Sequence, residues 1–207
     1  MPKNFFITGI GTDVGKTIAA AIVTEALEAE YWKPIQAGDL ENSDTHKVQK
    51  LISSEQTKFH PNSYALKTPM SPHAAAEIDG VEIEISNIHR PETDSDLVIE
   101  GAGGLMVPFN GKDTIMDLID KEDKVILVSR HYLGSINHTL LSIAALRSKG
   151  FENIYVIFNG EEHPTTEAAI KQMGNITVLG RIEPEPYFDK MVVKDYAEKF
   201  KESLCTI

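Results

Sequence analysis

The chain contains 207 residues, of which 42% are hydrophobic and 25% are charged. This balance is typical of a folded globular domain, and it excludes a disordered, collagen-like or coiled-coil chain. The 20 basic and 31 acidic residues give a net charge of −11, which disfavours nucleic acid and anionic membranes as partners. We therefore expect one domain over residues 1–207, with no nucleic-acid partner and no membrane association.

Cysteine content and the N-terminal residues give a prediction of the cellular compartment. Cys205 is the only cysteine, so an intrachain disulfide bond is excluded. No apolar run approaches the ~20 residues that a membrane-spanning helix needs. An apolar strand pattern begins directly after the first residues, which leaves no room for a signal peptide. These features predict a cytoplasmic protein.

Short apolar runs alternate with helical patterns along the chain. Continuous apolar runs are typical of strands buried on both faces, and they cover residues 5–7, 97–99, 125–128, 154–158 and 176–179, with a weaker run at 31–35. Apolar side chains recur at helical spacing over 18–27, 136–150 and 193–204. Most of the stretch 38–91 is polar and shows no clear pattern, although Asn42-Ser43-Asp44 is a suitable helix cap. The alternation predicts an α/β fold with a mostly parallel sheet, helices on both faces and ligands at the carboxyl ends of the strands.

The strongest motif is a glycine-rich loop between the first strand and the first helix. Residues 9–17 read Gly-Ile-Gly-Thr-Asp-Val-Gly-Lys-Thr, and backbone N–H groups in such a loop cradle phosphate oxygens. Lys16 would neutralise the β- and γ-phosphates, and the Thr17 hydroxyl would bind Mg²⁺. Five residues separate Gly9 and Gly15, one more than in the standard pattern, and Ile10 stands where the first glycine is expected. The loop predicts a P-loop NTPase fold.

A second motif ends the strand at 97–99. Glu100 follows this strand, and residues 101–104 read Gly-Ala-Gly-Gly. A carboxylate at this position can hold the Mg²⁺ that bridges the β- and γ-phosphates. The glycines after it would let backbone amides approach a substrate closely.

Including the motif at 100–104, five motifs after the phosphate loop occur in a fixed order and make the pattern specific. They are Lys-Pro-Ile-Gln-Ala-Gly at 33–38, Asn-Ser-Asp at 42–44, Ser-Pro-His at 71–73, Glu-Gly-Ala-Gly-Gly at 100–104 and Leu-Gly-Ser-Ile-Asn-His at 133–138. Together with the phosphate loop, this ordered set resembles the dethiobiotin synthetase family of biotin biosynthesis over residues 5 to 184.

The resemblance implies an ATP- and Mg²⁺-dependent ring closure. In this family, 7,8-diaminononanoate reacts with CO₂ or its bicarbonate source to give a carbamate, and ATP converts the carbamate to a mixed carbamic-phosphoric anhydride. The second amine then displaces phosphate, which gives dethiobiotin and leaves ADP. The resemblance also implies a homodimer whose two sites are shared across the interface.

Site residues follow from the same resemblance. The implied catalytic residues are Lys33, Lys16 and Thr12, and the implied metal ligands are Thr17, Asp44 and Glu100. The implied ATP-binding residues are Asp13, Val14, Gly15, Lys16, Thr17, Ile18, Asp44, Glu100, Gly101, Ala102, Gly103, Asn159, Gly160, Ile182, Glu183 and Pro184. Of these, Asn159 would recognise adenine through its side-chain amide, and residues 182–184 would close over the base. The implied substrate-binding residues are Thr12, Lys33, Ala37, Gly103, Leu133, Gly134 and Asn137, and the last three would act across the twofold axis.

The chain departs from the family pattern at several positions. Ala37 stands where the family usually has Ser or Thr, and Gly11 replaces a frequent Asp. Arg130 and His131 are unusual polar residues ahead of Leu133. These departures concern individual contacts with the substrate and leave the expected reaction class unchanged.

Three other classes of protein share the broad fold. A partition or positioning ATPase carries a signature Lys five residues before the loop Lys, where this chain has Gly11. A nucleotide-sensing module would not need the full set of charged site residues. A glutamine-dependent cobyrinate amidating enzyme needs a glutaminase domain with a nucleophilic cysteine, and Cys205 is the only cysteine available.

Overall fold

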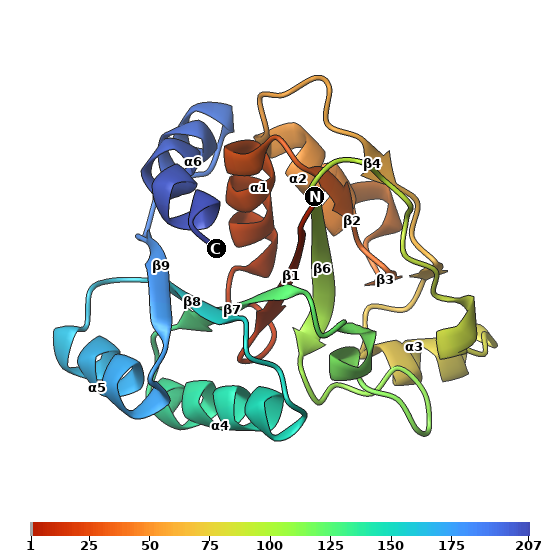
Figure 1. Cartoon of the computed structure of the whole chain (residues 1–207). Coiled ribbons are helices and arrows are strands. Elements are labelled where there is room, and N and C mark those ends of the chain that lie inside the picture. The colour runs from red at the N-terminus through yellow and green to blue at the C-terminus, as the bar shows by residue number, and fades with distance from the viewer. Residues whose placement is uncertain (1) are drawn as a thin grey trace.

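A computed structural model of the chain describes residues 2–207. Over these residues the main sheet has seven strands in the order β4-β2-β6-β1-β7-β8-β9 (Figure 1), and all their pairings are parallel. The bounds in chain order are β1 Asn4–Gly9, β2 Glu30–Trp32, β4 Phe59–His60, β6 Leu97–Gly104, β7 Lys124–Arg130, β8 Ile154–Asn159 and β9 Thr177–Ile182. Two further short strands, β3 (Ile35–Ala37) and β5 (Tyr64–Leu66), pair in parallel as a small second sheet.

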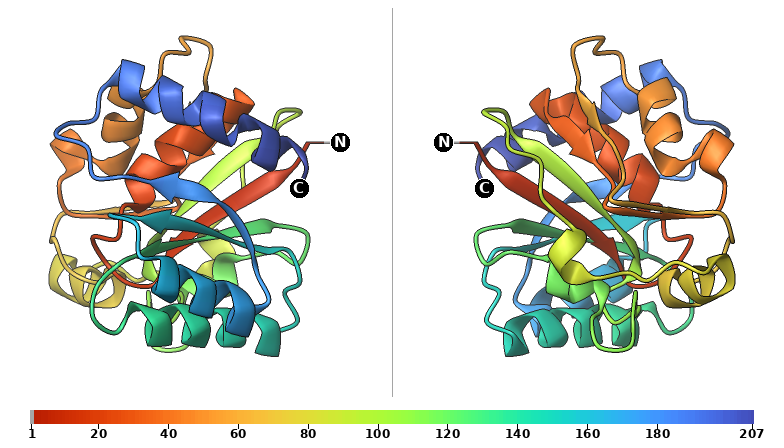
Figure 2. Two further views of the ribbon diagram at one scale, coloured as in Figure 1. Left: turned by 90° about the vertical axis from the view of Figure 1, so that its left-hand side faces the viewer. Right: turned by 90° about the vertical axis from the view of Figure 1, so that its right-hand side faces the viewer.

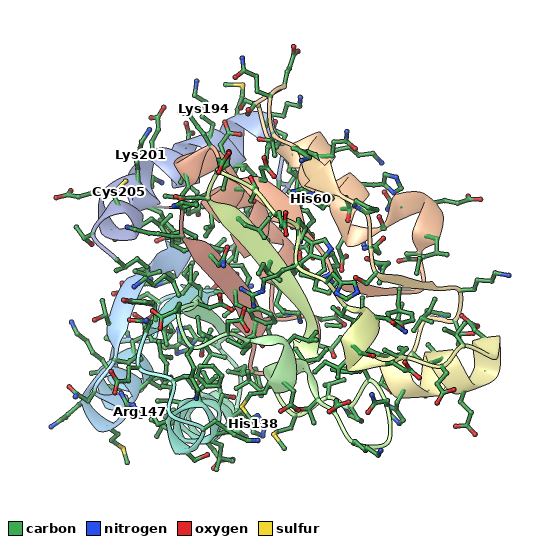
Figure 3. All side chains as sticks on the ribbon, turned by 45° about the vertical axis from the view of Figure 1, so that its right-hand side comes forward. His60, His138, Arg147, Lys194, Lys201 and Cys205 are labelled. Atoms are coloured by element: carbon green, nitrogen blue, oxygen red, sulfur yellow. The ribbon has the colours of Figure 1, made fainter. Side chains whose placement is uncertain are left out.

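Helices cover both faces of the main sheet (Figures 1 and 2). One face carries α1 (Lys16–Leu27), α2 (Asp44–Leu51) and α6 (Lys190–Cys205), and the other carries α3 (Pro72–Asp79), α4 (Ser135–Ser148) and α5 (Pro164–Gly174). None of the helices described is long and apolar enough to cross a membrane. Cys205 is free and exposed at the end of α6 (Figure 3).

The sheet divides the core into two layers. Side chains alternate along each strand, so Phe5 and Ile7 of β1 pack beneath α1 and α6, whereas Phe6 packs in the layer with α4 and α5. Burial on both faces explains why the central strands are continuous apolar runs. The predicted α/β class with a mostly parallel sheet and helices on both faces is confirmed.

The single strand predicted at 31–35 is wrong in one respect. This segment forms two strands, β2 and β3, which belong to different sheets. Pro34 lies at the break and has no N–H for a sheet ladder, so the chain leaves the main sheet there. The last predicted strand, 176–179, also continues to Ile182. As the capping motif predicts, the polar stretch contains a helix, α2, and Ser43 is its N-cap, with its Oγ accepting from His46 N at 3.4 Å.

Candidate active site

The phosphate loop joins β1 to α1 at the carboxyl end of the sheet. Asp13 and Gly15 both have left-handed backbone conformations, with φ of 55° and 96°. A Cβ atom at Gly15 would lie 2.3 Å from Asn159 Nδ2, so both the close approach and the positive φ require glycine. Among the described residues, no backbone carbonyl or side chain accepts from the backbone N–H groups of residues 12–18. The loop therefore presents a row of free donors, as an anion cradle must.

Lys16 begins α1 and folds back over the loop. Its Nζ donates to the Gly11 carbonyl at 3.0 Å. Burial lowers the pKa of Lys16, the positive charge of Lys33 lowers it further, and Glu100 and Asp44 act in the opposite direction. A bound phosphate would supply the negative charge that this partly desolvated ammonium group lacks.

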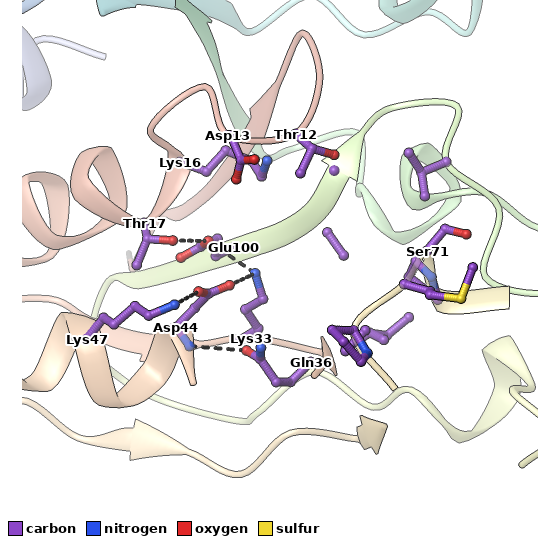
Figure 4. A pocket seen from close by; sticks show the side chains of 18 of the residues that line it. Thr12, Asp13, Lys16, Thr17, Lys33, Gln36, Asp44, Lys47, Ser71 and Glu100 are labelled. Atoms are coloured by element: carbon purple, nitrogen blue, oxygen red, sulfur yellow. Dashed lines mark hydrogen bonds and ion pairs between the residues drawn. The ribbon is translucent and has the colours of Figure 1, made fainter. Parts of the chain in front are cut away.

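Lys33 brings two carboxylates together at the bottom of the pocket (Figure 4). Its Nζ lies 2.6 Å from Asp44 Oδ2 and 3.1 Å from Glu100 Oε1. Burial alone would lower the pKa of Lys33, but the two carboxylates outweigh burial and raise this pKa above its ordinary value. Burial likewise acts to raise the pKa of Asp44, and the Lys33 ammonium outweighs it and lowers that pKa. Lys33 and Asp44 are therefore both charged at neutral pH.

Thr17 completes a set of oxygen donors around this pair. Its Oγ1 donates to Glu100 Oε1 at 2.9 Å, and Glu100 itself is only 1% exposed. One hydroxyl and two carboxylates from α1, α2 and β6 thus face the same space. Mg²⁺ prefers oxygen ligands of this kind, so the donor set fits that ion.

The surrounding pocket has a volume of about 660 Å³. It brings together most of the residues predicted on the phosphate and substrate side, and these are Thr12, Asp13, Gly15, Lys16, Thr17, Ile18, Lys33, Ala37, Asp44, Glu100, Ala102 and Gly103. Segment 69–72 and Val107 also line it. Residues that are more than 60 positions apart in the chain therefore meet in one cavity.

The residues predicted to contact adenine lie outside this pocket. Asn159 and Gly160 follow β8, and residues 182–184 follow β9 at the neighbouring strand end. Gly160 N donates to the Ile182 carbonyl at 2.9 Å, which joins the two segments. Asn159 Nδ2 donates to the Val14 carbonyl at 2.8 Å, so the phosphate loop is one partner of this amide.

Leu133, Gly134 and Asn137 also lie outside the pocket. Gly134 caps the N-terminus of α4 with a φ of 108°, and the Leu133 side chain is fully exposed. Within one copy of the chain these three residues do not reach the Lys33 cluster. Their predicted contact with substrate would have to come from a second copy.

Two functional positions were missed in the sequence. Tyr31 Oη donates to Glu100 Oε2 at 2.8 Å inside the core, but in an apolar strand it is indistinguishable from an ordinary core aromatic residue. Gln36 Oε1 accepts from Asp44 N at 3.2 Å, and its Nε2 donates to the Gly38 carbonyl at 3.0 Å. Its place within the motif at 33–38 was the only signal for Gln36.

A phosphate loop after a central parallel strand, with lysines and carboxylates gathered at adjacent strand ends, defines a P-loop nucleotide-dependent enzyme. Residues 3–192 match a family model described as an AAA domain. The chain is 71% identical to the ATP-dependent dethiobiotin synthetase BioD of Christiangramia forsetii over 100% of both chains. It is 47% identical to the protein of the same name from Cytophaga hutchinsonii, over 95% of this chain and 96% of that one. The chain belongs to the ATP-dependent dethiobiotin synthetase family, and it is an ATP-dependent ligase.

Solved structures of lower identity share the fold. A ParA family ATPase from Chlorobium tepidum aligns with a TM-score of 0.63 at 12% identity over 100% of both chains. A chain of the MinC:MinD cell division protein complex of Aquifex aeolicus aligns with a TM-score of 0.56 at 17% identity, over 99% of this chain and 96% of that one. Likeness at this identity concerns the fold alone, whereas the family assignment comes from the dethiobiotin synthetases. The resemblance stated from the ordered motifs is confirmed.

Proposed function

We propose that this enzyme forms dethiobiotin from 7,8-diaminononanoate, CO₂ and ATP, in a reaction that depends on Mg²⁺. The observation that carries the proposal is the position of Lys33 between Asp44 and Glu100, in the same pocket as the phosphate loop. The pocket thus offers cationic groups for phosphates and for a carbamate at one place. The name shared by the relatives supports the choice of substrates.

The first requirement is to hold an anionic carbamate beside ATP. Thr12 Oγ1 lies near Gly103, where an added Cβ would be 3.7 Å from it. We assign the Thr12 hydroxyl as a donor to the carbamate and Gly103 as the residue that leaves room for it. Ala37 has no side-chain hydroxyl, so a substrate contact at this position would use the backbone.

The second requirement is to neutralise charge during phosphoryl transfer. Lys16 and Lys33 would stabilise the negative charge that the phosphates and the carbamate bring together. Thr17, Asp44 and Glu100 would hold Mg²⁺, which when bound would offset the negative charge of the phosphates. The free N–H groups of residues 12–18 would bind the phosphate oxygens, with Asp13, Val14, Gly15 and Ile18 as part of this cradle and residues 101–103 beside it.

Ring closure requires less from the protein than phosphoryl transfer does. The second amine attacks the carbonyl carbon of the mixed anhydride, the C–O bond to phosphate breaks, and the amine loses its proton. Both reacting groups belong to one molecule, so the site has to hold them in contact and exclude water. The phosphate loop and segment 69–72 line one pocket, which offers a place for both groups.

Adenine would bind at the ends of β8 and β9. Asn159 Nδ2 donates to the Val14 carbonyl, which leaves the Asn159 Oδ1 to accept from the adenine amino group. Gly160 and residues 182–184 would lie against the base.

We further propose a homodimer of this one-domain chain. Leu133, Gly134 and Asn137 of one copy would reach the carboxylate of a substrate held by the other, and the full exposure of Leu133 supports an intermolecular role. The cytoplasmic location stays a prediction from the sequence.

The direct test is product formation by the purified protein. ATP, Mg²⁺, bicarbonate and 7,8-diaminononanoate are supplied, dethiobiotin is measured by mass spectrometry and ADP is measured in parallel. We expect dethiobiotin and ADP in equal amounts, and neither without the diamine. ADP that forms regardless of the diamine would exclude the proposed reaction.

A further inference from the structure

Arg130 is the unusual residue at the end of β7, and it contacts the phosphate loop from the side. Its Nη1 donates to the Asp13 carbonyl at 3.0 Å. Arg130 pairs in register with Asn159 on β8, and Asn159 donates to the Val14 carbonyl. The ends of two neighbouring strands thus hold two consecutive carbonyls of one loop.

The Asp13 and Val14 carbonyls shortly precede α1 in the chain. In a helix extended backwards, the Asp13 carbonyl would accept from Thr17 N–H and the Val14 carbonyl from Ile18 N–H. Arg130 and Asn159 occupy the two carbonyls instead, and the Thr17 and Ile18 N–H groups have no acceptor among the described residues. The two side chains therefore keep the donors of the first helical turn available for an anion.

The loop needs such support for two reasons. It is one residue longer than the standard pattern, and a longer loop has more conformations to lose when it is ordered. Asp13 also holds a left-handed conformation, with φ of 55°, which costs energy for a residue with a side chain. Arg130 forms no ion pair among residues 2–207, so the carbonyl of Asp13 is the partner that fixes its guanidinium group.

We propose that Arg130 is a positioning residue of the nucleotide site: with Asn159, it holds the carbonyls of Asp13 and Val14 out of the phosphate loop so that the loop N–H groups face the phosphates. The inference rests on the proposed function only through ATP binding. It does not depend on which acceptor receives the phosphoryl group.

The test compares Arg130→Met with a matched control, Arg147→Met. Arg147 lies on α4 (Figure 3) and is not among the residues that line the pocket. It is also an exposed arginine that donates to a backbone carbonyl, that of Asn175, at 2.9 Å. Calorimetry measures binding of a non-hydrolysable ATP analogue to each protein with Mg²⁺, at low and at high ionic strength. Steady-state assays give KM for ATP, KM for the diamine and kcat, and thermal unfolding reports on overall stability.

We expect Arg130→Met to weaken binding of the ATP analogue by about three- to tenfold, the size of one lost hydrogen bond. The KM for ATP should rise in parallel while the KM for the diamine and the melting temperature stay at the wild-type values. The same fold loss should remain at high ionic strength, because a positioning contact is not a long-range attraction. Arg147→Met should match the wild type.

Three results would overturn the proposal. Unchanged binding of the ATP analogue would remove any role for Arg130, and a loss that vanishes at high ionic strength would mean simple charge attraction. Equal losses for ATP and the diamine with a lower melting temperature would mean a purely structural role. Because binding is measured directly, a wild-type protein that binds the analogue but forms no dethiobiotin would disprove the proposed reaction and leave the role of Arg130 testable.

Discussion

Lys33 is only 3% exposed, and its ammonium group is the shared partner of the two carboxylates in the pocket. Lys33→Met would remove the charge and leave Asp44 and Glu100 facing each other. We expect turnover to fall by about 10²–10³-fold and the free energy of unfolding to fall by about 3–5 kcal/mol. Dethiobiotin formation and urea denaturation measure the two effects.

Lys47 provides the control for this prediction. Its Nζ lies 3.4 Å from Asp44 Oδ1, but its side chain is more than a third exposed. Exposed ion pairs contribute little, so Lys47→Met should retain stability close to that of the wild type. If Lys33→Met turned over at a rate near that of the wild type, the catalytic role of Lys33 would be wrong.

Tyr31 supports the same cluster from the core. The phenol is fully buried, and its hydroxyl donates to Glu100 Oε2. Tyr31→Phe keeps the ring and removes one donor from a buried carboxylate, so we expect a loss of about 1–3 kcal/mol in the free energy of unfolding. Tyr64→Phe is the comparison, because the Tyr64 hydroxyl only accepts from Glu84 N near the surface. Equal urea midpoints for the two variants would contradict a supporting role for Tyr31.

Gly15 shows how one position controls an element, the junction of the phosphate loop and α1. Ala at this position would meet the Asn159 amide at 2.3 Å and would need a φ of 96°, so the loop has to move. We expect Gly15→Ala to weaken ATP binding by about 5- to 150-fold, since the strain is of order 1–3 kcal/mol. Gly111→Ala is the matched control, because its Cβ would meet nothing within 4 Å and its φ is not left-handed. Calorimetry with the ATP analogue would refute the argument if the two variants bound equally.

The strands and helices also show why sequence patterns predict some elements and miss others. Central strands such as β1 and β7 are buried on both faces, so their apolar runs are unmistakable. The segment 31–35 is equally apolar, but its division at Pro34 depends on the second sheet, which arises from contacts with distant Tyr64–Leu66. Helices α3 and α5 both begin at a proline, Pro72 and Pro164, and neither stretch was predicted as a helix.

Across the whole molecule, the predictable part of the site is the part that resembles the family. Lys16, Thr17, Lys33, Asp44 and Glu100 come from four separate motifs and meet in one pocket because parallel strands place their carboxyl ends together. The contacts of Tyr31 and Arg130 were not predictable, since each depends on the register between neighbouring strands. Arg130 was noticed only as an unusual residue, and its partner, the Asp13 carbonyl, lies in the loop that follows the neighbouring strand β1.

The response of the whole molecule to acid follows from its carboxyl groups. Lys33 lowers the pKa of Asp44 below its ordinary value of 3.8, although burial opposes this shift, and Thr114 similarly lowers the pKa of Asp117 against the effect of burial. A lowered folded-state pKa means that the unfolded chain binds protons first, so each group stabilises the folded protein above the ordinary pKa of 3.8. This contribution is lost as the pH falls through the folded-state pKa.

We therefore expect urea midpoints to decrease as the pH falls below about 4, with Asp44→Asn less sensitive to this change than the wild type. At neutral pH, Asp44→Asn should be the less stable protein, because Lys33 loses one of its two charged partners. The difference between the two proteins should shrink towards low pH, where Asp44 of the wild type becomes protonated. A difference in urea midpoint that stays constant from neutral pH into this acid range would show that the Lys33–Asp44 pair does not link protonation to folding.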